Sequence, residues 1–312
     1  MEIDFGKYQK TLKTYRGASG SKISIIYNDE LYMLKFPANV TKQHLDIVYS
    51  NSSINEYIGC HIFESLGFET QKTLLGKFEG KIVVACRDFE INDYRFYDFG
   101  SLKNTLIDSE SNGYGMELKD ILEVFEKQNY YQAISPSKIK KHFWEMFVAD
   151  ALLANYDRHN GNWGFLYNDK TNDIKFAPIF DCGSCLFPLT TKDAKFKEIL
   201  ENPSMQAEMI YNYPPSAIRL NKTIINNYDF LTRTDNQDCL NALVNINERI
   251  DMEAICRIID ETPYISDLHK DFLKLMLSHR KEKILEQAII KNKNINQSVD
   301  MDEPSGPKGP RR

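Results

Sequence analysis

Two pairs of short segments near the N-terminus alternate apolar and polar positions with the period of β-strands. Residues 21–27 (SKISIIY) and 31–36 (LYMLKF) are separated by Asn-Asp-Glu, and residues 72–78 and 81–86 are separated by Glu-Gly. Asn, Asp and Gly tolerate the left-handed backbone of tight hairpin turns. The pattern therefore predicts two β-hairpins.

Helical spacing dominates further along the chain. Residues 53–56 (SINE) form a capping-box pattern, and apolar residues then recur every three or four positions until Gly67, which predicts a helix. A second helix is predicted to begin at Pro136-Ser137. Residues 194–290 read mostly as helix, including a long stretch from Ser266.

Two segments lack the apolar residues that a packed element needs. Residues 101–115 are polar and rich in Gly, Asn and Ser, which indicates a loop, and residues 291–312 are expected to be disordered. The resulting order predicts an α+β fold with two lobes. Residues 1–87 form the smaller, β-rich lobe with one helix, and residues 88–290 form the larger, mainly helical lobe.

The composition is that of a globular protein. The chain of 312 residues is 42% hydrophobic and 27% charged, which allows a substantial buried core. Its 39 basic and 44 acidic residues give a net charge of −5, which argues against a dedicated nucleic-acid or acidic-membrane partner. No apolar run is long enough to span a membrane, and the charged N-terminus shows no signal peptide, so a soluble cytoplasmic protein is expected.

Six cysteines are too few and too scattered for a disulfide scaffold at this length. Cys182 and Cys185 have the C-x-x-C spacing of a redox site or of half a zinc site. A zinc site needs two further ligands, which no second C-x-x-C or H-x-x-x-H motif supplies. No helical pattern follows Cys185, as a thioredoxin-like motif requires. We therefore expect two reduced thiols, with a redox protein as the alternative.

The strongest chemical signal lies directly after the helix that begins at Pro136. Asp157 is followed five residues later by Asn162 in the sequence D-R-H-N-G-N. This is the catalytic-loop spacing of protein kinases, in which the carboxylate accepts the proton of the attacking hydroxyl and the amide oxygen holds Mg²⁺ on the phosphates. Considered alone, the segment could equally be a polar turn between a helix and a strand.

A second carboxylate stands at the end of an apolar run. Asp181 follows residues 176–180 (FAPIF) and precedes Cys-Gly, which is how kinases present a metal-binding Asp, although such an Asp can also cap a turn. Residues 97–100 spell Tyr-Asp-Phe-Gly, but this D-F-G precedes Asp157, whereas the metal-binding motif must follow it. We therefore assign the metal site to Asp181 and not to Asp98.

Candidate phosphate-binding residues lie upstream of these motifs. Residues 16–22 (RGASGSK) form a Gly/Ser-rich loop before the first predicted strand, although they do not fit a Walker A motif. Lys35 lies on the second predicted strand in phase with Leu31 and Met33, where it could contact phosphate or carboxylate or could face solvent. Glu56 could pair with Lys35, as in kinases, or could close the capping box.

Taken together, these motifs resemble the HipA-like serine/threonine kinases. The resemblance rests on G-A-S-G-S-K, on Lys35, on Asn-Glu-Tyr at the start of the first helix, on D-x-H-x-x-N and on A-P-x-x-D, and it covers roughly residues 15–290. The D-R-H-x-x-N form also resembles the catalytic loop of phosphatidylinositol kinases. The resemblance implies a bilobal kinase fold that transfers phosphate from ATP to Ser or Thr with the help of Mg²⁺, and that phosphorylates itself.

The resemblance also implies residue roles. Asp157 is the expected catalytic base, Asn162 and Asp181 are the expected Mg²⁺ ligands, and Lys35, paired with Glu56, is expected to anchor the ATP phosphates. The other expected ATP-binding residues are Gly17, Ala18, Ser19, Gly20, Ser21, Lys22, Ala85, Cys86, Arg87 and His159. Residues 84–89 match the hinge, whose backbone groups hold adenine.

The expected partners are ATP and a protein substrate, including the chain itself, with Ser19 and Ser21 as candidate self-phosphorylation sites. HipA toxins carry an additional N-terminal subdomain that meets an antitoxin, whereas this sequence begins almost at the glycine-rich loop, so an antitoxin partner is not expected. Because one member of the group is a secreted protein, export into a host cell and a role in virulence fit the resemblance.

Other functions stay open at this point. Acceptor choice lies in surface loops that carry no readable code, so a lipid or small-molecule kinase with the same catalytic loop is the main alternative. A catalytically silent nucleotide-binding protein would be expected to lack one of Asp157, Asn162 and Asp181, and all three are present.

Overall fold

The computed structural model describes residues 2–15, 21–38, 50–107, 110–127, 134–213 and 215–302. Its strands are β1 (Lys10–Thr11), β2 (Lys22–Tyr27), β3 (Glu30–Lys35), β4 (Thr73–Phe78), β5 (Lys81–Arg87), β6 (Tyr94–Asp98), β7 (Gly164–Asn168), β8 (Asp173–Phe176), β9 (Arg219–Leu220) and β10 (Thr223–Ile224). Its α-helices are α1 (Ser52–Ser65), α2 (Phe99–Leu106), α3 (Leu118–Lys127), α4 (Pro136–Leu153), α5 (Asp193–Leu200), α6 (Pro203–Tyr211), α7 (Asn227–Leu231), α8 (Gln237–Arg249), α9 (Met252–Glu261), α10 (Asp267–Arg280) and α11 (Gln287–Asp302). Two 3₁₀-helices span η1 (Phe5–Lys7) and η2 (Glu110–Gly113), and the π-helix η3 (Lys281–Glu286) joins α10 to α11.

The two predicted β-hairpins are confirmed. β2–β3 and β4–β5 are antiparallel pairs within one five-stranded sheet of order β1-β2-β3-β5-β4. Asn28 and Asp29 have φ angles of 50° and 63°, and Glu79 and Gly80 have φ angles of 49° and 78°. Two left-handed residues in succession match the twist of the flanking strands, so these turns set the register of both hairpins.

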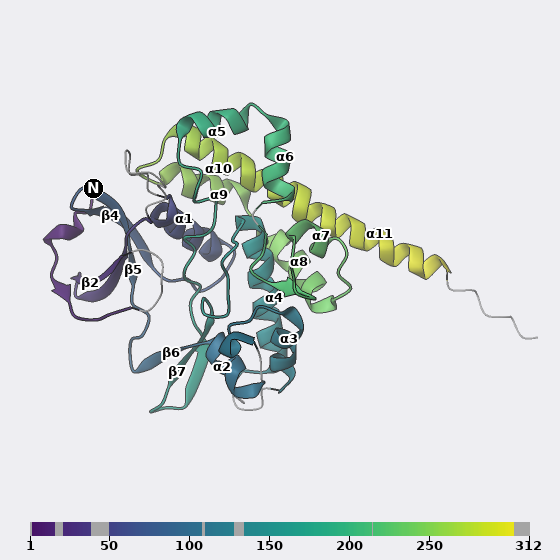
Figure 1. The fold of residues 1–312 in the computed structure, drawn as a ribbon, viewed down its shortest axis with the longest axis horizontal. Coiled ribbons are helices and arrows are strands. Elements are labelled where there is room, and N and C mark those ends of the chain that lie inside the picture. Colours follow the sequence, from purple (N-terminus) through teal and green to yellow (C-terminus); the bar gives the residue numbers. More distant parts are fainter. Residues whose placement is uncertain are drawn as a thin grey trace, which may run out of the picture.

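Strand β5, which lies between β3 and β4 in the sheet, is apolar on both of its faces. Val83 and Ala85 pack with Phe5 in a core on one side of the sheet. Val84 and Cys86 belong to the larger core on the other side, where α1 lies. Because successive side chains of a strand point to opposite faces, a continuous apolar run is what a sheet covered on both faces requires. Figure 1 shows α1 between this sheet and the helices of the second lobe.

Helix α1 starts differently from the prediction. Its N-cap residue Asn51 makes no side-chain hydrogen bond to the helix, and the Ser53 hydroxyl donates to the Lys35 carbonyl oxygen at 3.2 Å. The capping box expected for Ser53 and Glu56 is therefore wrong. The predicted end is correct, because Gly67 follows the helix with a φ of 87°, a conformation that few other residues adopt without strain.

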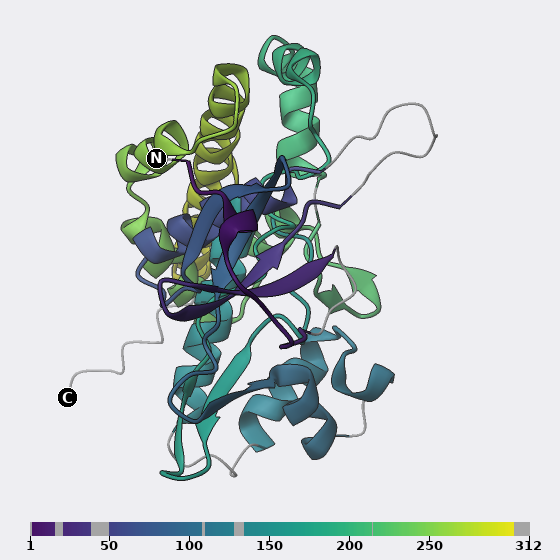
Figure 2. The same ribbon diagram turned by 90° about the vertical axis from the view of Figure 1, so that its left-hand side faces the viewer.

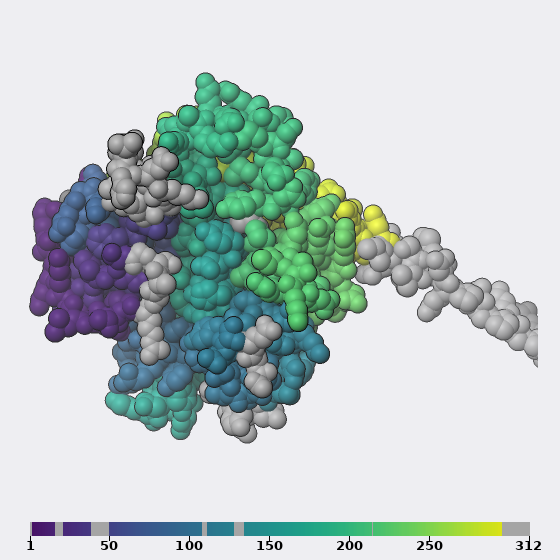
Figure 3. All heavy atoms as spheres, viewed as in Figure 1, coloured from purple at the N-terminus to yellow at the C-terminus, as the bar shows by residue number. Residues whose placement is uncertain are grey.

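The second lobe is built around α4, whose side chains are buried along most of its length. α4 packs against α3, α8 and α10. The region predicted to be mostly helical over residues 194–290 is confirmed: it holds α5 to α10, η3 and the start of α11, with the short strands β9 and β10 between α6 and α7. A small antiparallel sheet of order β6-β7-β8 lies at the edge of this lobe beside α2 (Figure 1). Figure 2 places the five-stranded sheet toward the viewer, and Figure 3 shows the first lobe at one end of the molecule. The predicted two-lobed α+β fold is confirmed.

The first part of the predicted loop over residues 101–115 is helical. Helix α2 occupies Phe99–Leu106, because Asp98 Oδ1 accepts the backbone N–H of Ser101 at 2.8 Å and so caps the first turn. The short helix η2 follows. The D-F-G sequence is therefore the beginning of a helix.

The predicted disorder from Lys291 onward is wrong as far as Asp302, because α11 continues through this segment. Lys291 Nζ donates to the Tyr228 hydroxyl at 2.8 Å, and Asn292 Nδ2 donates to the Leu231 carbonyl oxygen at 2.9 Å. Polar contacts thus extend a helix that has little apolar surface to bury. The final ten positions of the predicted tail lie outside the described residues. None of the described helices, α11 included, is long and apolar enough to cross a membrane.

Candidate nucleotide and catalytic site

Residues predicted from separate motifs meet in one cavity. The cavity has a volume of about 170 Å³. Lys22, Lys35 and Glu56 line it from the first lobe, and Asp157 and Asp181 line it from the second. Segments that lie more than 100 residues apart in the sequence therefore contribute charged side chains to a single space.

Lys35 bridges two carboxylates in this cavity. Its Nζ lies 3.1 Å from Glu56 Oε1 and 2.9 Å from Asp181 Oδ1. β3 supplies Lys35 and α1 supplies Glu56, and the hydrogen bond from Ser53 to the Lys35 carbonyl oxygen holds the helix against the strand. The Lys–Glu pair is thus present, and Asp181 joins it from the other lobe.

The charged side chains of the cavity shift one another's pKa values. Burial disfavours the charged form of Lys35, but Asp181 and Glu56 outweigh burial and hold the pKa of Lys35 well above its usual value. Lys35 in turn lowers the pKa of Asp181 to about 2. Burial raises the pKa of Glu56 against the opposing effect of Lys35. Lys22, which pairs with Lys35 across the sheet, has its pKa lowered by burial and by the charge of Lys35. The cavity therefore holds two lysines and an ionised Asp181, which suits an anion that arrives together with a cation.

Asp157 enters the cavity from the loop after α4. The Asn155 side chain accepts the backbone N–H of Asp157 at 3.1 Å. Five residues on, Asn162 Nδ2 donates to the Asp157 carbonyl oxygen at 2.8 Å, so the loop closes on itself. Burial raises the pKa of Asp157, and Asp181 adds to this rise while His159 opposes it. The five-residue separation of Asp157 and Asn162 therefore allows the Asn162 side chain to close the loop on the Asp157 backbone.

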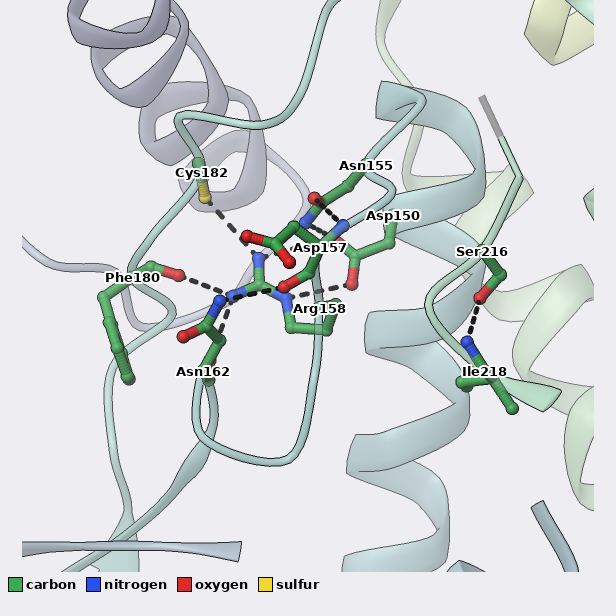
Figure 4. A network of polar contacts seen from close by, with 9 residues as sticks. All are labelled: Asp150, Asn155, Asp157, Arg158, Asn162, Phe180, Cys182, Ser216 and Ile218. Atoms are coloured by element: carbon green, nitrogen blue, oxygen red, sulfur yellow. Dashed lines mark hydrogen bonds and ion pairs between the residues drawn. The ribbon is translucent and has the colours of Figure 1, made fainter. Parts of the chain in front are cut away.

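Arg158 ties the Asp157 loop to the Asp181 loop (Figure 4). Its Nε and Nη2 donate to the two carboxylate oxygens of Asp150 at 3.0 and 3.3 Å. Its Nη1 donates to the carbonyl oxygens of Asn162 at 3.0 Å and Phe180 at 2.5 Å, and its Nη2 lies 3.6 Å from Cys182 Sγ. A buried guanidinium is tolerated only when its charge and donors are satisfied in this way.

Helix α1 packs directly on the residue after Asp181. A Cβ atom added at Gly59 would lie 2.7 Å from the Cβ of Cys182, so glycine is required for this close approach. Hydrogen bonds from Cys185 and from Cys60 of α1 lower the pKa of the Cys182 thiol well below its usual value. All six cysteines are free, as expected, and the C-x-x-C pair is fully buried.

Among the described residues, Ser21 and His159 are predicted ATP-binding residues that do not line the cavity. Gly17, Ala18, Ser19 and Gly20 lie outside the described residues. The Ser21 carbonyl oxygen accepts the backbone N–H of Phe36 at 3.1 Å. The His159 ring accepts the backbone N–H of Gly161 at 3.0 Å through Nδ1. Asn162 does not line the cavity itself, but its side chain is hydrogen-bonded to the backbone of Asp157, which does.

Ala85, Cys86 and Arg87, which belong to the predicted hinge, form the end of β5. Ala85 and Cys86 pair with β3 on one side and with β4 on the other. The Arg87 N–H donates to the Lys72 carbonyl oxygen at 2.8 Å, and Gln71 Nε2 donates to the Arg87 carbonyl oxygen at 3.0 Å. The backbone of these three residues is therefore engaged within the first lobe, and the assignment of the hinge to residues 84–89 stays a prediction.

The motifs missed three residues of the site. Asp150 lies within an otherwise apolar part of α4, and a buried carboxylate in such a helix indicates a cationic partner, so this signal was available. Tyr156 and Ser184 line the cavity beside Asp157. Nothing in the local sequence marks them, because their contacts depend on how the two loops meet.

Asp181 and Asn162 fit the oxygen-ligand chemistry of Mg²⁺. This ion is commonly held by one or two protein oxygens together with phosphate oxygens and water. The described residues contain no group of three or more His, Cys, Asp and Glu side chains that could hold a metal ion. The donor set therefore suits a cation that arrives with a nucleotide.

Comparisons with known proteins extend this picture to most of the chain. The HipA-like C-terminal domain family matches residues 16–262. The chain is 49% identical over 277 residues to the serine/threonine-protein kinase CtkA of Helicobacter pylori strain J99, a match that covers 88% of this chain and 84% of that protein.

Two solved structures are similar to this chain over most of its length. The crystal structure of a Helicobacter pylori proinflammatory kinase CtkA matches with a TM-score of 0.86 and 46% identity, over 93% of this chain and 98% of that chain. A chain of the Shewanella oneidensis toxin–antitoxin complex of HipA, HipB and operator DNA has the same fold, with a TM-score of 0.55 and 14% identity, over 91% of this chain and 69% of that chain. The family match spans both lobes and every motif that meets in the cavity, and the chain belongs to the HipA-like C-terminal domain family.

Proposed function

We propose that the chain is an ATP- and Mg²⁺-dependent serine/threonine protein kinase. The observation that carries this proposal is the bridge that Lys35 makes between Glu56 and Asp181, in the cavity that Asp157 also lines. The 49% identity to a protein named as a serine/threonine kinase supports the same activity for this chain.

The first lobe supplies the cationic groups for the nucleotide. Lys35 projects from β3 and forms ion pairs with Glu56 and Asp181. The phosphate oxygens of a bound nucleotide would replace Asp181 as a partner of Lys35, while Glu56 keeps the lysine in place. Lys22 lines the same cavity on the neighbouring strand. Asp181 and Asn162 would hold Mg²⁺, which neutralises the charge that develops on the phosphates during transfer.

Asp157 is the proposed base. It orients the hydroxyl of a Ser or Thr side chain, a bond forms between that oxygen and the γ-phosphorus, and the bond from the γ-phosphorus to the ADP oxygen breaks. The hydroxyl proton passes to the Asp157 carboxylate. Closure of the loop by Asn162 holds the backbone of Asp157, which limits the reorganisation needed for transfer.

The proposed substrates are proteins, and the chain itself is one of them. Autophosphorylation at Ser19 or Ser21 would add about −1.5 to −2 charges next to the nucleotide phosphates. We expect such a modification to weaken ATP binding by like-charge repulsion.

Transfer of labelled phosphate from ATP tests the proposal. The full-length chain is incubated with Mg²⁺ and ATP, with a generic protein acceptor in one arm and phosphatidylinositol vesicles in another. Label on protein that disappears with a chelator and in Asp157→Asn supports a protein kinase. Label on lipid alone would support the lipid-kinase alternative, and no label in any arm would overturn the proposal.

A further inference from the structure

The D-F-G sequence, to which the proposed mechanism gives no role, lies against the loop that carries the proposed base. The Phe99 N–H donates to the Trp163 carbonyl oxygen at 2.9 Å, and the two rings stack with 4.2 Å between their centroids. The next N–H, that of Gly100, donates to the Asn160 carbonyl oxygen at 2.9 Å. The start of α2 is therefore bonded to the Asp157 loop and to the residue that follows it.

Asn160 makes the largest share of these contacts. Its Nδ2 donates to the carbonyl oxygens of Gly113 at 3.0 Å and Gly115 at 2.9 Å, and its backbone N–H donates to the Met116 sulfur at 3.3 Å. Together with the bond from α2, the backbone N–H, the carbonyl oxygen and the side-chain amide of Asn160 are all bonded to the chain around α2 and η2.

The two N–H donors of the Asn160 amide carry the side-chain contact. The residue is fully buried, and its Oδ1 accepts no hydrogen bond from the described residues. Both partners of the amide are carbonyl oxygens, so only its NH₂ end can face them. A side chain of the same shape without these donors therefore cannot replace Asn160.

The partners of Asn160 are themselves fixed. They belong to residues 99–107 and 110–116, which we call the α2–η2 segment. Gly113 has a φ of 88°, and a Cβ atom added there would lie 2.0 Å from the Gly100 carbonyl oxygen, so the two ends of the segment are in close contact. The fully buried Lys103 donates to the Gly115 carbonyl oxygen at 2.7 Å. The segment is thus a firm support for the loop.

Asn160 lies where it can transmit this support to the proposed base. The His159 N–H donates to the Asp157 carbonyl oxygen at 2.8 Å, and the Asn162 N–H donates to the His159 carbonyl oxygen at 2.8 Å. A shift at position 160 would therefore move the residues on both sides of it. Arg158 holds the loop to Asp150 and to the Asp181 loop, and Asn160 holds it to a different part of the lobe.

We propose that Asn160 is a positioning residue that anchors the Asp157 loop to the α2–η2 segment and so places the Asp157 carboxylate for the acceptor hydroxyl. The inference rests on the proposed kinase function. Position 160 is one that the D-x-H-x-x-N motif leaves open, and the anchor gives the D-F-G sequence a supporting role in place of a metal-binding one.

Steady-state kinetics of Asn160→Ala and Asn160→Asp test this role. Each variant should lower kcat by roughly one to two orders of magnitude, because misplacing a reacting group by about 1 Å can cost about a hundredfold. The KM for ATP should change little, because Lys35 and Asp181 lie outside the anchored loop. Asn160→Asp keeps the shape and lacks the donors, so it should be no better than Asn160→Ala. Met116→Leu removes one acceptor at similar volume and should cause a smaller loss of kcat, which also tests the anchor if the Asn160 variants do not fold.

Asn168→Ala is the matched control for a general structural effect. Asn168 is buried at the end of β7, and its Nδ2 donates to the Asn92 carbonyl oxygen at 3.0 Å, outside the Asp157 loop. This variant should lose stability in urea unfolding and keep the wild-type kcat. A wild-type kcat in Asn160→Ala or Asn160→Asp, or an equal loss of kcat in Asn168→Ala, would overturn the inference. If the wild-type chain transfers no phosphate at all, the proposed function has failed, and the inference fails with it.

Discussion

The guanidinium of Arg158 donates a hydrogen bond to the carbonyl oxygen of Phe180 at 2.5 Å, across 22 residues of sequence. Arg158 directly follows the proposed base Asp157, and Phe180 directly precedes the proposed metal ligand Asp181. One planar side chain therefore fixes both the separation and the orientation of the two loops. Its position explains why the catalytic sequence contains an arginine that does not line the cavity.

Removing this arginine should destabilise the fold. Arg158→Met leaves Asp150 buried without its cationic partner, and breaking a buried ion pair in this way costs about 3–5 kcal/mol. Urea unfolding of the variant and of wild type measures the difference. Arg158→Met combined with Asp150→Leu should recover a large part of it, because no buried charge is then left unpaired. Equal midpoints for Arg158→Met and wild type would contradict the role of this pair.

Asp157→Asn should lose turnover by roughly two orders of magnitude or more, as is typical for a general base, and should keep most of its ATP affinity. The amide preserves the shape of the side chain but cannot accept the proton. Labelled-phosphate transfer measures turnover, and nucleotide titration measures affinity. Near-normal turnover would remove Asp157 from the mechanism.

Asp181→Ala and Asn162→Ala should weaken Mg²⁺-dependent nucleotide binding, because each removes an oxygen ligand for the ion. Asp98→Ala is the matched control. Asp98 caps α2 through Ser101, so its loss should cost about 1 kcal/mol of stability and leave the Mg²⁺ dependence unchanged. Calorimetric titration of Mg²⁺ and ATP into each variant measures this. A dependence governed by Asp98 would move the metal site to the D-F-G sequence.

His269 should make the fold sensitive to acid. Its ring is buried and stacks on Phe196 at 4.4 Å between centroids. Burial lowers its pKa to about 4, with Asp193 opposing, whereas an unfolded histidine titrates near about 6.5. As the pH falls from about 6.5 toward about 4, the unfolded chain takes up a proton that the folded chain does not, so stability is lost, by up to about 3 kcal/mol. Above this range both states are neutral and the residue contributes no pH dependence.

His269→Phe should therefore flatten the pH dependence of the free energy of unfolding between about pH 6.5 and pH 4. Denaturant unfolding at several pH values in this window compares the variant with wild type. Identical slopes would show that His269 is protonated in the folded chain as readily as in the unfolded one.

Local chemistry decided which predictions from sequence succeeded. The turns at Asn28-Asp29 and Glu79-Gly80 need nothing beyond their own residues, and both hairpins are confirmed. The end of α1 at Gly67 and the start of α10 after Ser266 follow from capping in the same way. The cap at Asp98 was an equally local signal, but it was outweighed by the polar composition of the segment that follows.

Tertiary contacts decided the rest. Glu56 fits a capping box and an ion pair equally well in sequence, and only the approach of β3 to α1 selects Lys35 as its partner. Residues 85 and 86 lie both in a predicted strand and in the predicted hinge, and only the structure shows that pairing with strands on both sides engages their backbone. Ser184 carries no signal at all, because it comes to the same cavity as Asp157, 27 residues earlier in the sequence, only when the two loops are joined by Arg158.

The close packing of Gly59 on Cys182 couples a helix of one lobe to a loop of the other. Glu56 lies three residues before Gly59 on the same helix, and Asp181 lies directly before Cys182. A rotation of α1 that withdrew Glu56 from Lys35 would have to drag Asp181 along with it. Inactivation by outward movement of α1 is therefore disfavoured in this protein. A compound that displaced α1 would have to break the packing of Gly59 on Cys182 between the lobes.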